Sequence, residues 1–182
     1  MKKNLRVIIV VLICAALCVG YYFYLSNRTA RLSGEPTELE MLITKDLESS
    51  YPTTPREVMR LYNRILECMF DGDWEEEEFE RLSSQMRLLL DDQLLEANPL
   101  ETYLHNLKAE VNSFRKEGKQ FINVQISFSQ DIEKKNVNGS ECAYVEAVYS
   151  VKGKKDTEQS IQTYVLRKGE DGRWRILGFY RP

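Results

Sequence analysis

The sequence predicts an α+β domain behind an N-terminal transmembrane helix. Residues 7–25 are apolar and uncharged, and residues 54–116 repeat their apolar side chains at helical spacing. After Gly118 the apolar side chains instead alternate with polar ones, which is the pattern of a half-buried strand. Helices followed by strands are typical of α+β folds. We therefore expect three or four helices packed on a four-stranded antiparallel sheet.

The composition is that of a globular domain with a mildly acidic surface. Of the 182 residues, 43% are hydrophobic and 29% are charged, and the formal net charge is −3. Without the three positive charges of Lys2, Lys3 and Arg6, which precede the apolar segment, this charge becomes −6. A protein that binds nucleic acid needs a basic face, so this balance argues against a nucleic-acid partner.

The apolar segment Val7–Leu25 has the length of a membrane-spanning helix. Its nineteen residues, at about 1.5 Å each, nearly match a hydrocarbon core of about 30 Å. Aromatic residues crowd its end at positions 21–24, as is typical of the membrane interface. A cleaved signal peptide is the alternative, but it would have a shorter apolar region and small residues before the cleavage site. We therefore expect an uncleaved anchor over residues 1–25.

Basic residues flank the anchor, with a small excess on its N-terminal side. Lys2, Lys3 and Arg6 precede it, whereas only Arg28 and Arg31 follow it closely. Cytoplasmic flanks carry the greater share of Lys and Arg. This asymmetry predicts a single-pass protein of the cell membrane, with a cytoplasmic N-terminus and an extracytoplasmic domain.

Residues 26–53 are interpreted as a stalk that contains one short helix. Thr37 can cap the start of this helix, with Glu40 reaching back to the cap. The apolar residues that follow share one helical face: Leu39, Leu42, Ile43 and Leu47. We expect this face to pack on the domain, which spans residues 54–182.

Capping sequences predict three further helices within the domain. They begin at residues 54–57, 73–76 and 98–101, where Thr, Asp or Asn is followed three residues later by Glu. The third of these helices has an inward stripe of apolar residues: Leu100, Leu104, Leu107, Val111 and Phe114. Gly118 is expected to end it.

Four strands are expected after Gly118. They cover about residues 122–128, 143–151, 161–166 and 174–180. Turns are expected at residues 138–139, 153–156 and 169–172, because these positions are rich in Gly, Asn and Asp. Such short connections allow only antiparallel neighbours.

Residues with catalytic potential are few. His105 is the only histidine, and it lies more than about 90° from the apolar stripe of its helix, so we expect it to face solvent. Cys14 and Cys18 belong to the apolar segment. Cys68 and Cys142 could form one disulfide outside the cytoplasm, although two buried thiols are the simpler interpretation. These residues provide no catalytic, cofactor-binding or metal-binding set, and no cofactor is expected.

An acidic run and several tyrosines have structural interpretations. A calcium loop that starts at Asp71 would need Gly at its sixth position and Glu at its twelfth, but Glu76 and Leu82 occupy these places. The acidic residues therefore fit the solvated first turn of a helix, where they complement its dipole. The tyrosines of the domain fit core positions, and a tyrosine-lined pocket is the alternative: Tyr62, Tyr103, Tyr144, Tyr149, Tyr164 and Tyr180.

Two segments resemble the NTF2-like superfamily, also called the cystatin-like α+β cone. They are the first domain helix at residues 54–62 (TPREVMRLY) and the last strand at residues 172–179 (GRWRILGF). The resemblance implies a helix that crosses a curved antiparallel sheet, often with a concave pocket. Ketosteroid isomerase-like and polyketide cyclase-like members place an acid or a histidine there, and no residue here maps onto that position. Residues 42–60 also resemble small membrane-anchored proteins of unknown function from Gram-positive anaerobes.

Three functions are compatible with these features. The first is a non-enzymatic, membrane-tethered module that binds a protein partner or self-associates. The second is a scaffold subunit of a secretion or conjugation machine, since anchored NTF2-like domains occur in such machines. The third is a small-ligand binder or enzyme that uses the cone pocket. An open pocket would favour the third function, and a cone filled by its own side chains would favour the first.

Overall fold

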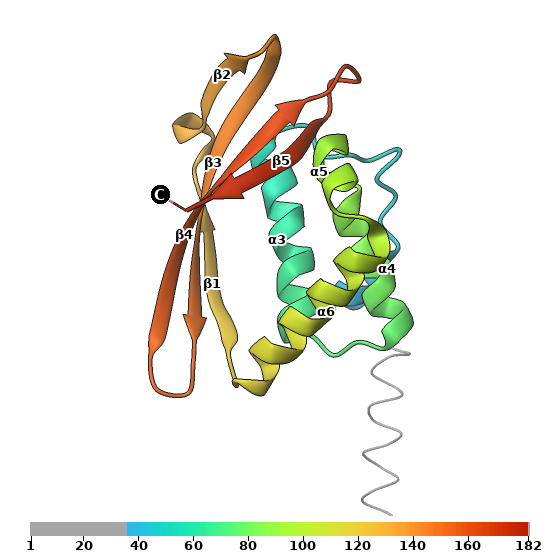
Figure 1. Ribbon diagram of the computed structural model, residues 1–182, viewed down its shortest axis with the longest axis vertical. Helices are drawn as coiled ribbons and strands as arrows, with labels where there is room; N and C mark the ends of the chain where they lie inside the picture. Colours follow the sequence, from blue (N-terminus) through green and yellow to red (C-terminus); the bar gives the residue numbers. More distant parts are fainter. Residues whose placement is uncertain (1–35, 182) are drawn as a thin grey trace, which may run out of the picture. The chain divides into compact units, whose positions relative to one another are not determined.

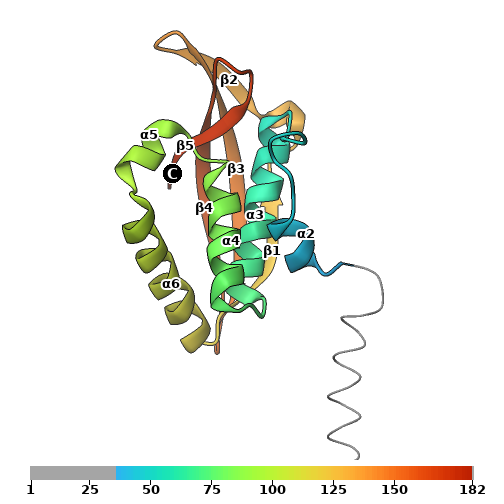
Figure 2. The ribbon, with the colours of Figure 1, turned by 90° about the vertical axis from the view of Figure 1, so that its right-hand side faces the viewer.

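The computed structural model describes residues 36–181, of which residues 38–181 belong to one compact unit (Figure 1). The helices of this unit are α2 (Glu38–Ile43), α3 (Pro55–Asp71), α4 (Glu76–Arg87), α5 (Asp92–Ala97) and α6 (Leu100–Lys116). Its strands are β1 (Gln120–Ile126), β2 (Glu133–Val137), β3 (Ser140–Lys152), β4 (Thr157–Lys168) and β5 (Trp174–Tyr180). The α-helices cover one face of the sheet, and the other face carries no α-helix in the described part of the chain (Figures 1 and 2). A short 3-10 helix at Ser129–Asp131 connects β1 to β2. The unit is therefore an α+β domain with one inner and one outer sheet face.

The sheet is antiparallel throughout and has five strands, in the order β1-β3-β4-β5, with β2 also paired to β3. Strand β3 is long enough to pair with β2 over its first half and with β1 over its second half. The expectation of four strands was wrong, because β2 was missed. All five residues of β2 are exposed, so the strand has no apolar alternation to reveal it. Only its backbone pairing with β3 defines it.

The turn between β2 and β3 was predicted correctly. Asn138 and Gly139 both have positive φ angles, of 52° and 86°. Two consecutive residues of this kind are what a tight hairpin turn requires, and Asn-Gly adopts them at low conformational cost.

Of the three predicted capping boxes, only the first is confirmed as predicted. The Thr54 hydroxyl accepts a hydrogen bond from the Glu57 amide at 3.2 Å, and Glu57 accepts one from the Thr54 amide at 3.1 Å. The second box lies two residues later than expected, because Glu75 rather than Asp73 caps α4. The third is wrong: Asn98 ends α5, a helix that was not expected, and its side-chain amide donates to the Leu94 carbonyl at 2.9 Å.

Helix α3 lies over small residues on the inner sheet face. Val58, Met59, Ile65 and Met69 of α3 are buried, and so are the β3 residues Ala143, Val145 and Ala147. Leu42 and Leu47 also join this core, at 1% and 3% exposure, which confirms the packing expected for their face. Leu100 was expected to face inward but is 49% exposed, because α6 enters the core only from its second turn onward.

The free edge of β5 is closed by the segment between α4 and α5. The Asp91 amide donates to the Ile176 carbonyl at 2.8 Å, and the Ile176 amide donates to the Leu89 carbonyl at 2.9 Å. Leu90 and Ile176 thus form a parallel bridge. The Asp91 carboxylate, in a residue only 6% exposed, also binds the Arg167 guanidinium of β4 through both oxygens. Asp91 therefore fixes this segment to the sheet.

Arg115 ties the end of α6 to the end of α3. Its guanidinium donates to the carbonyls of Phe70 and Met69, both at 2.9 Å, and to that of Gly72. It also lies 4.5 Å from the centre of the Trp74 ring. The last carbonyls of a helix lack partners within it and carry partial negative charge, so a cation there satisfies both needs.

The helix expected to span the membrane, Val7–Leu25, lies outside the described residues together with its basic flanks. Within the described residues no helix has the length and apolar character that a membrane span requires.

Replacing Arg115 with Met should lower the free energy of unfolding by about 2–4 kcal/mol, because three charge-assisted hydrogen bonds are lost and the Met69 carbonyl keeps only the Trp74 indole N–H as a side-chain donor. Urea unfolding followed by circular dichroism measures this change. Lys116→Met, at the exposed neighbouring position, is the matched control and should change the stability little. Equal stability of the two variants would show that the Arg115 contacts contribute nothing.

Candidate functional site

A cavity of about 340 Å³ lies between α3, α6 and the inner face of the sheet. Half of its sixteen lining residues are aromatic: Tyr62, Phe70, Tyr103, Phe114, Phe121, Tyr149, Tyr164 and Phe179. Sites for small molecules are usually concave and mostly apolar, with a few polar groups that fix orientation. This cavity has that character, and we treat it as the candidate site.

Regular spacing brings these side chains to the cavity. Helix α3 contributes Tyr62, Leu66 and Phe70, which are four residues apart and so share one helical face. Helix α6 contributes Tyr103, Leu107, Glu110 and Phe114 by the same rule. The sheet contributes alternate residues of β4, which point to one side of the strand: Ser160, Gln162 and Tyr164.

The aromatic rings pack on one another and form the wall of the cavity. Phe70 and Phe114 meet edge to face at 5.0 Å between ring centres, and Phe114 stacks on Phe121 at 5.2 Å. A second group joins Tyr62 to Tyr164 at 5.7 Å and Tyr164 to Phe179 at 5.4 Å. Such pairs contribute about 0.5–1.5 kcal/mol each beyond the area that they bury. The wall is therefore stabilised by its own contacts.

A chain of hydrogen bonds runs from the core to the cavity. The Tyr149 hydroxyl is 2.8 Å from Oδ1 of Asn63 and 2.7 Å from the Tyr164 hydroxyl, which is in turn 2.9 Å from Oε1 of Gln162. Two hydroxyl protons cannot serve three contacts, so one of the amides must turn and donate its N–H. Asn63 is only 3% exposed, and its Nδ2 is a buried donor without a partner. Rotation of the Asn63 amide would complete the chain.

Burial keeps the phenols of this site protonated. Burial raises the pKa of Tyr103 to about 12 and raises the pKa values of Tyr149 and Tyr164 further. Burial also raises the pKa of Tyr62 well above its ordinary value. These groups are therefore neutral hydrogen-bonding groups at physiological pH. Glu110, the only carboxylate among the lining residues, is exposed. The site thus offers aromatic surface, neutral phenols and an amide, which suits ligand recognition.

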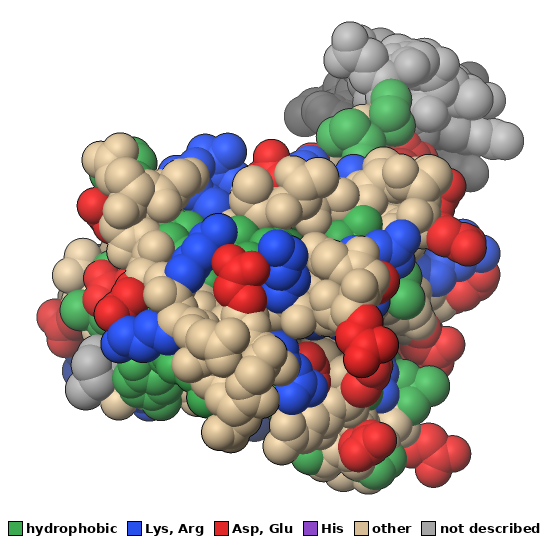
Figure 3. All heavy atoms as spheres, turned by 90° about the horizontal axis from the view of Figure 1, so that it is seen from above, with side chains coloured by type: hydrophobic (Ala, Val, Ile, Leu, Met, Phe, Trp, Pro, Cys, Tyr) green, Lys and Arg blue, Asp and Glu red, His purple; other side chains and the backbone are tan. Residues whose placement is uncertain are grey.

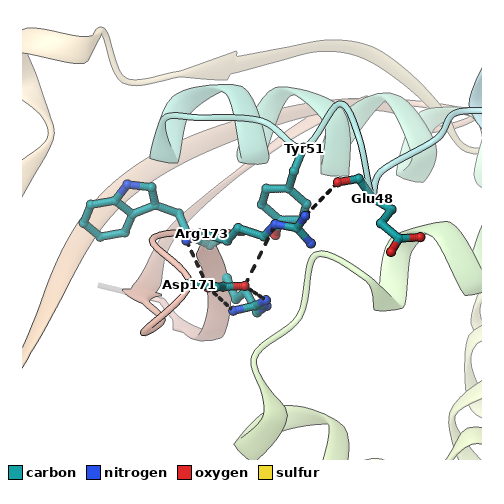
Figure 4. A network of polar contacts seen from close by, with 6 residues as sticks. Glu48, Tyr51, Asp171 and Arg173 are labelled. Carbon is teal, nitrogen blue, oxygen red and sulfur yellow. Dashed lines mark hydrogen bonds and ion pairs between the residues drawn. The ribbon is translucent and has the colours of Figure 1, made fainter.

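A second hollow, of about 620 Å³, lies beside the loop after α2 and the start of β5. Its polar groups bind one another (Figure 4): the Arg173 guanidinium donates to the Glu48 carbonyl at 2.8 Å and lies 5.0 Å from the centre of the Tyr51 ring. The Tyr51 hydroxyl donates to the Trp174 carbonyl at 2.8 Å, and burial raises the pKa of Tyr51 to about 12. These contacts fix the loop to the sheet, so we assign this hollow a structural role.

The histidine, the acidic run and the cysteines that were considered from the sequence do not line the cavity. His105 is exposed on α6, as expected. Glu76, Glu77 and Glu78 form the first turn of α4, and no group of metal-ligating residues occurs in the described part of the chain. Cys68 is half-buried on α3 and Cys142 is buried on β3, and both are free thiols. Burial raises the pKa of the Cys68 thiol, so it is poorly reactive at neutral pH.

A family comparison covers both the apolar N-terminus and the domain. The chain matches the family described as a domain of unknown function, DUF6715, over residues 1–179. It belongs to the DUF6715 family. No curated protein matches the sequence. The DUF6715 match includes residues 7–25 and all the aromatic residues of the cavity, the last of which is Phe179.

Several residues of the DUF6715 cavity were not expected from the sequence. The tyrosines had been considered as a possible pocket lining, and Tyr62, Tyr103, Tyr149 and Tyr164 do line the cavity. Phe70 and Phe121 were missed as lining residues, as was Gln162. The sequence of α3 did carry a signal for the cavity, because Tyr62 and Phe70 lie on one face of the helix with Leu66 between them. Such large aromatic side chains at the end of a core helix leave space between them. Gln162 carries no such signal.

The free energy of unfolding should fall as the pH rises from about 10 to 12, because buried tyrosines resist ionisation in the folded protein. Tyrosines in the unfolded chain ionise near pH 10, whereas in the folded protein burial raises the pKa of Tyr103 to about 12 and that of Tyr149 further. Above pH 10 the unfolded chain holds fewer protons, so alkali favours unfolding. Urea unfolding at a series of pH values measures this.

The same experiment can separate the contribution of the hydrogen-bonded tyrosines from that of the other tyrosines. Tyr149→Phe should make the alkaline decline shallower, whereas Tyr144→Phe, which lies on the other face of β3 and outside this hydrogen-bonded chain, should leave it unchanged. A decline of equal slope in both variants would contradict the assignment.

Proposed function

We propose that this chain is a membrane-tethered, extracytoplasmic module that binds a small, ring-containing apolar molecule in the aromatic cavity. The observation that carries the proposal is the cavity itself, with its eight aromatic lining residues. An open cavity favours the ligand-binding function among the three that the sequence allows. Neutral phenols and an amide favour binding over chemistry, so the module is proposed to be non-enzymatic.

The ligand should be mostly apolar and should carry at least one polar group. Aromatic and aliphatic side chains dominate the lining, whereas Ser160 and Gln162 offer hydrogen bonds from the sheet. Glu110 and Arg181 are the only charged lining residues, and both are exposed. A ligand with rings in the cavity and a polar group near Gln162 would satisfy both environments.

The arrangement also supports the proposed membership of the NTF2-like superfamily. Helix α3 packs against β1, β3 and β5 on the inner face of an antiparallel sheet. The strand that contains Trp174 closes the domain, as the resemblance implies. The cavity beside α3 supports this proposal, because the resemblance implies a concave pocket.

Filling the cavity should abolish ligand binding. Ser160 lines the cavity, and its neighbour Gln159 is exposed and absent from the lining. Ser160→Phe should weaken binding of the probe 1-anilinonaphthalene-8-sulfonate at least tenfold, because the new ring occupies the space of the probe. Fluorescence titration of residues 36–182, which contain the described core, measures this.

Gln159→Phe is the matched control, since it adds the same ring outside the cavity, and it should bind the probe like the parent chain. Equal binding by all three proteins would remove the small-ligand function. Such a result would favour the protein-binding function instead.

The proposed tether is tested separately with the full chain. It should stay in the membrane fraction after an alkaline wash, and protease added outside intact cells should digest the domain. Deletion of residues 7–25 should release the domain from the membrane. A full chain that the alkaline wash extracts, or a domain that resists external protease until the cells are lysed, would contradict the tether or its orientation.

A protein-binding function is the second candidate, and one observation favours it. Within residues 36–181 no α-helix lies over the outer face of the sheet, which exposes apolar side chains, with Ile161 at 44% and Tyr180 at 51% exposure. Val148 lies directly across from Ile161 and extends this apolar area. A scaffold role in a secretion or conjugation machine would be a specific form of this function.

A further inference from the structure

Four exposed lysines gather at one end of the domain, and none of them has a carboxylate partner in the part of the chain that the structure describes. They are Lys116, Lys152, Lys154 and Lys155. Five other lysines of the described residues form ion pairs: Lys108, Lys119, Lys134, Lys135 and Lys168. The remaining one, Lys45, is half-buried beside the second hollow. Among the described residues, the exposed lysines without an ion pair are therefore concentrated in one place.

The fold brings these four lysines together from two segments. Lys116 ends α6 and Lys152 ends β3, while Lys154 and Lys155 belong to the β3–β4 turn. Figure 1 shows this turn and the end of α6 at the same end of the unit, and a shallow groove of about 660 Å³ runs between them. Gly118 has a φ of 67°, and a Cβ there would lie 3.1 Å from the Lys154 side chain. Glycine thus allows the turn to approach the end of α6 closely.

The nearby acidic groups do not neutralise this end. Glu117 lies 2.9 Å from Lys119 and Glu158 lies 3.9 Å from the same ammonium group, so Lys119 engages both. Asp156 is the remaining carboxylate of the groove. The lysine end, defined as Lys116, Lys119, Lys152, Lys154 and Lys155, therefore keeps a positive surplus on a chain whose formal charge is −3.

The opposite end of the domain is different. There, acidic and basic side chains are interspersed (Figure 3). Lys168 lies 3.0 Å from Glu141, and Lys135 lies 2.8 Å from Glu133. The contrast shows that, within the described residues, the exposed lysines without an ion pair are gathered at the lysine end.

We propose that the lysine end docks on a bilayer surface that contains anionic lipids. Lysine is a flexible point charge that does not need the fixed geometry of an arginine fork, which suits a diffuse layer of headgroups. Each lysine close to an anionic surface strengthens attachment about fivefold. The docking rests on the proposed membrane tether: residues 26–37 span at most about 40 Å, so the domain stays near the bilayer.

Docking in this way would bring the aromatic cavity close to the lipid. Phe114 precedes Lys116 by two residues, and Phe121 follows Lys119 by two, and both rings line the cavity. An apolar ligand that partitions into the bilayer would then reach the cavity over a short path.

Lysine acetylation in lipid nanodiscs tests the proposal. The full chain is placed in nanodiscs of phosphatidylcholine, or of phosphatidylcholine with phosphatidylglycerol. An acetylating ester is added, and mass spectrometry measures the acetylation rate of each lysine. The rates at Lys116, Lys152, Lys154 and Lys155 should fall at least fivefold in the anionic discs. The rate at Lys45 should not change, and salt of about 0.5 M should remove the effect by screening.

Two triple variants distinguish the effect of losing the docking surface from the effect of losing three positive charges. The acetylation rate of Lys116 is the readout in both. Lys152→Gln/Lys154→Gln/Lys155→Gln should abolish the slowing at Lys116. Lys108→Gln/Lys134→Gln/Lys135→Gln, which removes the same charge elsewhere, should retain it.

Three outcomes would overturn docking. They are equal rates in the two kinds of disc, equal slowing at Lys45, and the same slowing when inorganic phosphate is added to phosphatidylcholine discs. The last outcome would reassign the lysine end to a soluble anion. A chain that does not enter phosphatidylcholine discs at all would instead refute the tether.

Discussion

The contact between Arg115 and the last carbonyls of α3 sets the geometry on which the rest of the domain depends. It fixes the C-terminal ends of α3 and α6 to each other, and these two helices supply one side of the aromatic cavity. The same guanidinium covers the Trp74 ring, which packs on Phe79 of α4 at 4.6 Å between ring centres. One half-buried cation therefore positions three helices over the sheet.

The cavity arises from a gradient of side-chain size along β3. At one end of its inner face lie Ala143, Val145 and Ala147, over which the core is fully closed. Farther along, Tyr149 and Val151 line the cavity. Small residues let a helix approach a sheet closely, whereas large rings hold it away. Because Tyr149 also binds Asn63 of α3, the point at which the packing opens is fixed by a hydrogen bond as well as by volume.

Features determined by local chemistry could be predicted from the sequence, and those determined by tertiary contacts could not. The Thr54 box, the Asn138-Gly139 turn and the buried face of α2 follow from neighbouring residues, and each is confirmed. Strand β2 was missed because only its pairing with β3 makes it a strand. The cavity was foreseen only as a possible set of tyrosines. Its depth depends on how α6 is held, which no local pattern encodes.

The bridge between Leu90 and Ile176 has a consequence for self-assembly. An open strand edge is a template on which a second chain can add by backbone pairing, and aggregation begins at such edges. Here the amide and the carbonyl of Ile176 are already used by Leu89 and Asp91, and the Asp91–Arg167 pair keeps them in place. A change that loosens the segment between α4 and α5 would therefore expose this edge of β5 and promote aggregation before the domain unfolds.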